Sequence, residues 1–427
     1  MSSFKWLYPG MRVKRWLLLV PVGAFAIVVG VVLLANIKVF EYLNGAASIA
    51  FIKFGIHLDR PSTYVPISLV LIIFGLALIF ISLRQVVRSI VSVVDPSARN
   101  KLAEMVFQKR SLAQGKRIVV IGGGTGLSTM LRGLKQYTSN ICAVVTVTDD
   151  GGSSGVLQRE LGMLPPGDIR NCLVALADAE PLMTELFQYR FDAGSSSLQG
   201  HSFGNLLIAA MTSITGDFEK AVKETSNILA IRGRVLPSTV ERVTLHAELA
   251  DGTIADGETN IVKSGQPIKH VFITPADAQP LEEALHAIRL ADAVVIGPGS
   301  VYTSIIPNLL VKGIADAIAD SDATKIYVCN VMTQPGETDG YSASKHVEAV
   351  ADHAERRIFS YVLVNKQVPS EELLAKYREQ GAELVMPDVD KIREMGYRPV
   401  VGDYISETEV VRHNPDSLAE AILRLIY

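Results

Sequence analysis

Two long apolar runs stand near the start of the chain. Leu17–Ala35 and Tyr64–Leu83 contain no charged side chain. A helix of about 20 residues spans about 30 Å, the thickness of a bilayer core. We therefore predict an N-terminal two-helix transmembrane hairpin over residues 1–91, with spans at about 17–35 and 64–83. A cleaved signal peptide or two buried core helices would show similar runs, but no small-residue cleavage site follows the first run.

Basic residues before and after this hairpin indicate its orientation. Lys and Arg side chains precede the first run and follow the second, which favours both ends in the cytoplasm. We expect a multi-pass protein of the inner cell membrane, with the lipid bilayer as a partner and the remaining chain in the cytoplasm. Residues 92–116 are polar and basic, which predicts a helical linker. Its basic side chains face either water or anionic lipid head groups.

From Arg117 onward, short apolar runs alternate with longer amphipathic stretches. This alternation is typical of βαβ units, and it predicts an α/β fold with a doubly wound, mostly parallel sheet in residues 117–427. Residues 242–273 differ, since they show only β patterns around a turn at Asp251-Gly252, so we expect a small β insertion there. The expected strands of the main sheet are Ile118–Ile121, Ala143–Thr148, Ala293–Ile296, Ile326–Asn330 and Tyr361–Asn365.

Composition narrows the class of protein. The chain has 427 residues and a formal net charge of −3, which argues against a nucleic-acid partner. Its mean hydropathy of +0.27 agrees with a membrane part. Cys142, Cys172 and Cys329 lie far apart without CxxC spacing, which excludes a disulfide scaffold and a zinc-binding module.

The first candidate binding element is a glycine-rich turn after the first strand. Glycines permit close backbone approach, and the N-terminus of the following helix offers free N–H groups to an anion. The turn is not a strict GxGxxG sequence, and it lacks the GK[ST] of a P-loop, so an ATPase is not indicated. A tight turn without a ligand is the alternative. Its residues are Gly122, Gly123, Gly124, Thr125 and Gly126.

Two aspartates follow the next strand. Asp149 and Asp150 end it, and carboxyl ends of parallel strands form the edge where ligands bind. Such carboxylates can hold a divalent metal, bond a ribose or position a nucleophile, whereas the alternative is an Asx turn. Gly151, Ser153 and Ser154 come next and could contact a phosphate.

Further polar residues stand at the starts of later helices. Asp168 follows a Pro-Pro-Gly turn and is either an N-cap or a ligand group. The others could contact a base, sugar or phosphate, or they belong to solvated or structural turns. They are Arg170, Asn171, His201, Asn205, Arg232 and Arg234.

A second glycine turn has the same arrangement as the first, between the end of a strand and the start of a helix. Gly297, Pro298, Gly299 and Ser300 follow a strand and open a helix. Two such turns in one sheet suggest one ligand that spans both, such as a nucleotide diphosphate. The polar turn Thr333–Thr338 is expected at the same edge, where it could line the pocket.

Six ordered motifs resemble one family. They are IGGGTGLST, VTVTDDGGSSG, PPGDIRNCL, HSFGNLL, IGPGSVYTSIIPNLL and MTQPGETDGYSASKH, and they extend from about Lys116 to Asn414. They are similar to the YvcK-like gluconeogenesis factors, within the wider CofD-like group of 2-phospho-L-lactate transferases. The resemblance implies a Rossmann-like fold with a nucleotide in its cleft. The N-terminal hairpin is not part of the usual family pattern.

The resemblance implies two functions. YvcK-like members bind UDP-sugars, UDP-N-acetylglucosamine in particular, and support cell shape and wall synthesis during gluconeogenic growth. This favours a membrane-anchored regulator with cell-wall synthesis proteins as partners and a homo-oligomeric state. The alternative is a CofD-like transferase acting on a nucleotide-diphosphate-linked substrate, with Mg²⁺ held by Asp149, Asp150 and Asp168. A dinucleotide-binding protein is a third possibility, which the glycines after Asp150 do not favour.

Overall fold

The structure is a computed structural model, and it describes residues 14–35, 61–94, 102–178, 181–191, 198–407 and 410–427. The chain divides into two compact units, residues 1–109 and 110–427. Each unit is described by itself below. The connection between the two apolar runs and residues 95–101 of the predicted linker lie outside the described residues.

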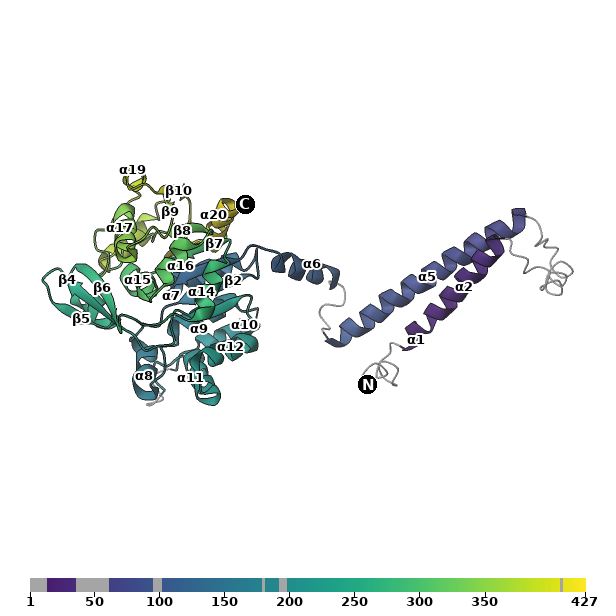
Figure 1. The fold of residues 1–427 in the computed structure, drawn as a ribbon, viewed down its shortest axis with the longest axis horizontal. Coiled ribbons are helices and arrows are strands. Elements are labelled where there is room, and N and C mark those ends of the chain that lie inside the picture. Colours follow the sequence, from purple (N-terminus) through teal and green to yellow (C-terminus); the bar gives the residue numbers. More distant parts are fainter. Residues whose placement is uncertain (1–13, 36–60, 95–101, 179–180, 192–197, 408–409) are drawn as a thin grey trace. The chain divides into compact units, whose positions relative to one another are not determined.

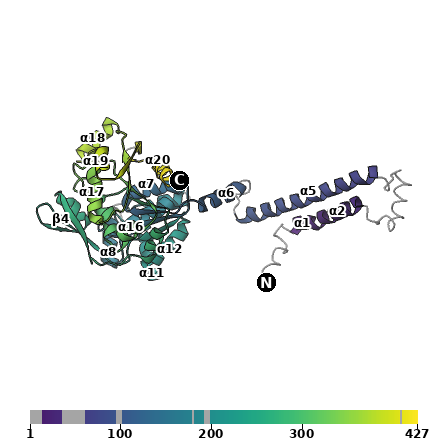
Figure 2. The same ribbon diagram turned by 45° about the horizontal axis from the view of Figure 1, so that its top comes forward.

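The first unit is a pair of helices built from the two apolar runs (Figures 1 and 2). A short helix α1 (Lys14–Leu17) leads into α2 (Leu19–Leu34), which packs along α5 (Pro61–Val94). Within the described residues, Tyr64–Ser89 of α5 is long and apolar enough to cross a membrane, whereas α2 is shorter. The predicted pair of apolar helices is therefore observed.

Small residues bring these two helices into close contact. A Cβ atom placed on Gly75 would lie 2.5 Å from the carbonyl oxygen of Gly23, and one on Gly30 would lie 2.8 Å from that of Ser68. Glycine is needed there because the two backbones touch. Large apolar side chains such as Phe25 and Phe80 are exposed instead, which is the arrangement expected of a hairpin surrounded by lipid.

The second unit contains a seven-stranded parallel sheet in the order β10-β9-β8-β7-β1-β2-β3, which confirms the predicted α/β class. Two of its strands, β3 and β10, were not expected from the sequence. Both lie at edges and contain a proline, which weakens the strand pattern. The strands are β1 (Ile118–Gly122), β2 (Ile141–Val145), β3 (Arg234–Pro237), β7 (Ala293–Ile296), β8 (Thr324–Val328), β9 (Tyr361–Asn365) and β10 (Arg398–Gly402).

Helices cover both faces of this sheet (Figure 1), so the buried strands β1 and β2 are apolar throughout. Helix α6 (Leu102–Ala113) includes the boundary between the two units. The described helices of the second unit after it are α7 (Gly124–Leu134), α8 (Gly152–Leu161), α9 (Gly167–Leu176), α10 (Pro181–Gln188), α11 (Phe203–Thr215), α12 (Phe218–Leu229), α13 (Glu258–Ser264), α14 (Glu282–Arg289), the π-helix η3 (Val301–Ile305), α15 (Ile306–Leu310), α16 (Ile314–Asp320), α17 (Ala343–Ala354), α18 (Glu371–Glu379), α19 (Val389–Glu394) and α20 (Pro415–Ile426).

The β insertion is a separate antiparallel sheet in the order β5-β4-β6. Its strands are β4 (Thr244–Leu249), β5 (Ile254–Asp256) and β6 (Ile268–Thr274), and the predicted turn at Asp251 joins the first two. The prediction of β structure alone was wrong, because α13 lies between β5 and β6. A further hairpin, β11 (Ile405–Glu407) and β12 (Val411–His413), precedes α20.

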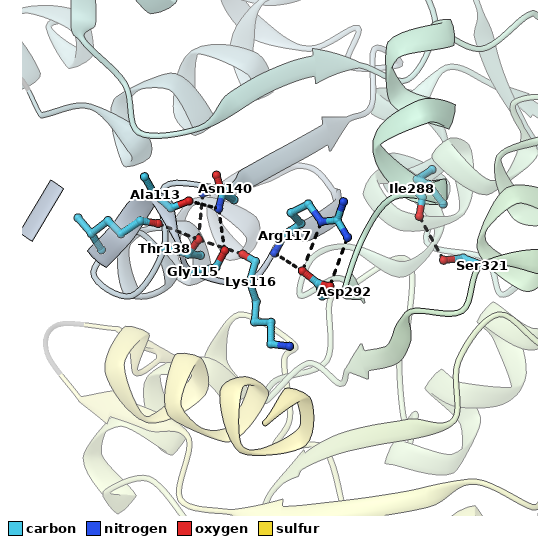
Figure 3. A network of polar contacts seen from close by, with 10 residues as sticks. Ala113, Gly115, Lys116, Arg117, Thr138, Asn140, Ile288, Asp292 and Ser321 are labelled. Carbon is cyan, nitrogen blue, oxygen red and sulfur yellow. Dashed lines mark hydrogen bonds and ion pairs between the residues drawn. The ribbon is translucent and has the colours of Figure 1, made fainter. Parts of the chain in front are cut away.

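Hydrogen bonds join the residues just before strand β2 to the end of α6 and the residues that follow it (Figure 3). The Asn140 amide donates to the carbonyl oxygens of Ala113 and Gly115 at 2.9 and 2.7 Å. The backbone N–H of Arg117 donates to Asp292 at 2.7 Å, and its guanidinium pairs with the same carboxylate. The last residues of the predicted linker are therefore held against the amino edge of the sheet.

Candidate functional site

The two glycine turns meet at the point where the order of strands reverses. Strands β1 and β7 are neighbours, and α7 and η3 begin directly beyond their carboxyl ends. A Cβ atom on Gly126 would lie 2.8 Å from the carbonyl oxygen of Pro298, so the turns touch backbone to backbone. In open α/β sheets this switch point is where ligands bind.

The first turn starts α7 with extended backbone at Gly123 and a left-handed Gly124, whose φ is +68°. No side chain within the turn caps the helix. The carboxyl group of Asp168 in α9 lies close to this turn, since a Cβ atom on Gly123 would lie 2.4 Å from its Oδ2. Thr125 is exposed at this end of the helix, so further N–H groups of the first turn remain available to an anion.

The second turn is held by side chains from the loop after β8. The Asn330 amide donates to the carbonyl oxygen of Gly299 at 2.8 Å and accepts from its N–H at 3.3 Å. The Gln334 amide donates to the Ser300 hydroxyl at 2.6 Å, and its own oxygen is buried without a partner. A buried acceptor of this kind requires a donor, which a ligand can supply.

A cleft of about 500 Å³ opens over the two turns. Among the residues predicted from the sequence, ten line it. They are Gly123, Gly124, Thr125, Gly126, Asp149, Asp168, Asn171, Pro298, Gly299 and Ser300. Gly122 and Gly297 are not part of the lining. Gly122 is the last residue of β1 and its carbonyl oxygen accepts from Thr146, whereas Gly297 follows β7 and its N–H donates to Ile121.

One part of the cleft is lined by carboxyl groups. Asp149 and Asp168 come from the main sheet edge, and Glu258 comes from α13 of the β insertion. Burial, and then the charge of Asp149, raise the pKa of Asp168 to about 6. Burial, followed by the charges of Asp149 and Asp168, raises the pKa of Glu258 to about 9. Glu258 is therefore a neutral carboxylic acid at pH 7.

These carboxyl groups do not form the metal site expected for a transferase. The carboxylate of Asp150 accepts two hydrogen bonds from Thr259, from its N–H at 3.0 Å and from its hydroxyl at 2.7 Å. In the described part of the chain, no three His, Cys, Asp or Glu side chains are grouped so as to hold a metal ion. The predicted set of Asp149, Asp150 and Asp168 is thus not supported by the geometry.

Arg412 supplies positive charge to the cleft. It stands on β12, and burial followed by the charge of Arg412 lowers the pKa of the neighbouring Arg132 on α7. Among the described residues, neither guanidinium has a carboxylate within ion-pairing distance. Two adjacent cations without a counter-ion favour the binding of an anion between the glycine turns and β12.

Another part of the cleft is apolar and aromatic. Val331, Met332, Tyr377 and Val411 line it. His413 also lies here, but its ring bonds to the carbonyl oxygen of Cys329 and burial lowers its pKa to about 4. This histidine is therefore neutral, and the surface suits an uncharged ring.

Several predicted residues form a network behind the cleft wall. The Ser153 hydroxyl bonds to His201 Nδ1 at 3.0 Å and accepts from the Asn205 amide at 3.1 Å. Arg170 contacts Ser202 and donates to the side chain of Asn171 at 2.8 Å. These residues do not line the cleft, but through Arg170 the network holds Asn171, which does. Gly151 and Ser154 also lie outside the lining, at the start of α8.

Arg232 and Arg234 lie away from the cleft, at the opposite edge of the sheet. Arg232 pairs with Asp178 at 2.7 Å, and Arg234 is the first residue of β3. The carboxyl end of β3 is instead Pro237. Neither arginine lines the cleft, and strand β3, which begins at Arg234, was not recognised in the sequence.

Other lining residues were not found from the sequence. Thr333 and Gln334 belong to the polar turn expected there, but Thr129, Glu258, Ser304, Tyr377, Arg412 and His413 were missed. They come from elements far apart in the chain, and most carry no local motif. Only Thr129 and Ser304 could have been found from the sequence, because each lies one turn into the helix that follows a glycine turn.

Comparison with known families agrees with this geometry. Residues 118–405 match the family described as 2-phospho-L-lactate transferase CofD. A putative gluconeogenesis factor from Nostoc is 49% identical over 428 residues, which cover 99% of this chain and 92% of that relative. This chain belongs to the CofD-like gluconeogenesis-factor family.

Gluconeogenesis factors differ in whether they have the first unit. The gluconeogenesis factor of Bacillus subtilis is 48% identical over 316 residues, which are 99% of that protein and 74% of this chain. A solved structure of a UPF0052 family member from Bacillus halodurans covers 72% of this chain and 99% of its own, with 52% identity and a TM-score of 0.70. The second unit is therefore a complete fold without the first.

The raised pKa of Glu258 predicts how stability depends on pH. Its native carboxyl keeps a proton that the unfolded chain releases above pH 4.5, so the native state loses stability as pH rises from 4.5 towards 9. Glu258→Gln mimics the protonated form. At pH 8.5 we expect this substitution to raise the Tm of residues 110–427 by about 4 °C, which corresponds to about 2 kcal/mol in the free energy of unfolding. At pH 5 we expect the Tm to change little.

Thermal unfolding followed by circular dichroism at both pH values tests this expectation. The matched control is Glu372→Gln on the exposed face of α18, which should change Tm equally little at both. A lower Tm for Glu258→Gln at pH 8.5 would mean that the native carboxyl is ionised and well solvated.

Proposed function

We propose that the cleft binds a nucleoside-diphosphate sugar, UDP-N-acetylglucosamine, and that the protein is a membrane-anchored regulator of cell shape and wall synthesis during gluconeogenic growth. The assignment of the ligand as a nucleoside-diphosphate sugar rests on one observation. The starts of α7 and η3 adjoin at the switch point, and the unpaired Arg412 lines the same cleft. Helix N-termini with an arginine suit a diphosphate.

The remaining lining supports the same ligand class. The part around Met332, Tyr377 and Val411 offers an apolar, aromatic surface to a base. The part around Asp149 and Asn171 offers hydrogen-bonding groups to a neutral polar moiety. The cleft thus has an anion-binding part at the glycine turns, an apolar part and a polar part. These match the diphosphate, the base and the sugar of such a ligand.

A regulatory role is favoured over transfer by the placement of the aspartates. Asp150 holds Thr259, so its carboxylate does not join Asp149 and Asp168 around one point. The family that matches the chain is nevertheless described by a transferase. Metal-dependent transfer of a nucleotide-diphosphate-linked group is therefore the second candidate, and the same experiment distinguishes the two.

The experiment is calorimetric titration of residues 110–427 with UDP-N-acetylglucosamine, with and without Mg²⁺. NAD and GDP serve as comparison ligands, and chromatography follows the fate of the bound nucleotide. We expect saturable binding, with the ligand recovered intact. Conversion of the ligand in the presence of Mg²⁺ would favour the transferase, and no saturable binding of any UDP-sugar would refute the proposal.

We further propose that α2 and α5 anchor the protein in the membrane. The apolar exposed faces of both helices support this placement. We expect the full chain to sediment with membranes and to resist extraction with alkaline carbonate, because transfer of these faces into water is costly. Residues 110–427 should remain in the supernatant. Release of the full chain by carbonate would show peripheral attachment instead.

A further inference from the structure

Helix α13 belongs to the β insertion, but the loop between β2 and α8 holds its N-terminus. The N–H and the hydroxyl of Thr259 both donate to Asp150 Oδ1. Asp150 thus caps a helix that begins more than a hundred residues later in the chain. Gly257, with φ of +84°, makes this approach possible, since a Cβ atom there would lie 2.0 Å from Asp150 Oδ2.

The other end of α13 packs against the turn after β8. A Cβ atom on Gly336, whose φ is +81°, would lie 2.4 Å from the carbonyl oxygen of Val262 in α13. The adjacent Gln334 lines the cleft. Ile261 between these contacts is fully buried. The helix is therefore clamped between two loops at the carboxyl edge of the main sheet.

This clamp places Glu258, the first residue of α13, in the cleft lining. Around it stand Asp149, Asp168 and Asn171, which also line the cleft. The aspartate carboxylates repel a diphosphate, which is attracted to Arg412 instead. Hydroxyl and amide N–H groups of a sugar are donors, and carboxyl oxygens accept from them.

We infer that Glu258 is a specificity-determining residue for the sugar half of the ligand, and that Asp150 is the positioning residue that holds it in place through Thr259. The inference rests on the proposed nucleoside-diphosphate sugar site and assigns a role to the β insertion, which contributes Glu258 to the lining of that site. The adjacent aspartates of the loop after β2 thus have separate roles, since Asp149 lines the cleft and Asp150 binds α13.

The test compares two ligands, UDP-N-acetylglucosamine and UDP, on residues 110–427 by calorimetry. Glu258→Ala is expected to weaken binding of the sugar nucleotide about 10-fold and to leave UDP binding within about twofold. Asp150→Ala should cause the same selective loss. Asp150→Asn should largely restore binding, because its amide oxygen can still accept from Thr259.

Glu248→Ala, on β4 of the same insertion and paired with Lys269, is the matched control and should bind both ligands normally. The inference would be overturned if Glu258→Ala lost affinity for UDP and UDP-N-acetylglucosamine equally, or if its affinity for both were unchanged. If circular dichroism shows that Asp150→Ala does not fold, Glu258→Ala and Thr259→Val test the inference in its place. Both should lose affinity for UDP-N-acetylglucosamine and keep their affinity for UDP. If the unmodified protein binds neither ligand, the proposed function itself fails.

Discussion

Replacing Arg412 with alanine is expected to weaken binding of UDP-N-acetylglucosamine by about 100-fold. The guanidinium lines the cleft beside the two glycine turns, and among the described residues no carboxylate neutralises it. A charge-assisted, bidentate contact with a phosphate contributes about 2–3 kcal/mol, which corresponds to this loss. Since the contact is with the diphosphate, UDP should lose affinity by the same factor.

Calorimetry with both ligands on residues 110–427 measures this effect. Arg412→Lys should recover only part of the affinity, because an ammonium cannot form the two parallel hydrogen bonds. Arg424→Ala is the control, since that arginine is exposed on α20 and pairs with Glu420. Undiminished UDP binding by Arg412→Ala would place the phosphates elsewhere in the cleft.

Replacing Gly126 with valine is expected to abolish binding and to destabilise the second unit by about 3 kcal/mol. A Cβ atom there would lie 2.8 Å from the carbonyl oxygen of Pro298 and 3.3 Å from the N–H of Gly299. Both neighbours are backbone, so no side chain can rotate away to relieve the overlap. The two turns must separate, which removes the joint anion site and exposes buried strand ends.

Urea unfolding and calorimetry on residues 110–427 together test this expectation. Gly216→Ala at the end of α11 is the control, because its φ is +71° but a Cβ atom there meets nothing within 4 Å. It should cost about 1 kcal/mol from backbone strain alone and leave binding intact. Normal ligand affinity in Gly126→Val would show that the turns act independently.

The sheet and the glycine turns could be predicted because their signals are local. Buried parallel strands read as continuous apolar runs, and a strand followed by glycines and a helix has a recognisable order. The expected strands at 118, 293 and 361 were found in place, and both turns line one cleft. The edge strands β3 and β10 were missed because proline interrupts their pattern.

The remaining residues of the site could not be predicted in the same way. Arg412, Tyr377 and Glu258 lie on short elements without a motif, and each reaches the cleft through packing against distant segments. The position of Arg232 and Arg234 outside the cleft could not be predicted for the same reason. Without β3 in place, nothing in the sequence indicates that these arginines stand at the amino edge of the sheet.

The sequence by itself determined the two apolar helices, the α/β class, the family and the glycine-rich edge, because hydrophobic period and turn chemistry act over a few neighbouring residues. Only the tertiary structure decided which polar groups share the cleft. Asp150 appears from sequence to be a ligand group, yet its carboxylate caps α13. That choice depends on a hydrogen bond between residues 109 positions apart, and no local pattern encodes such a contact.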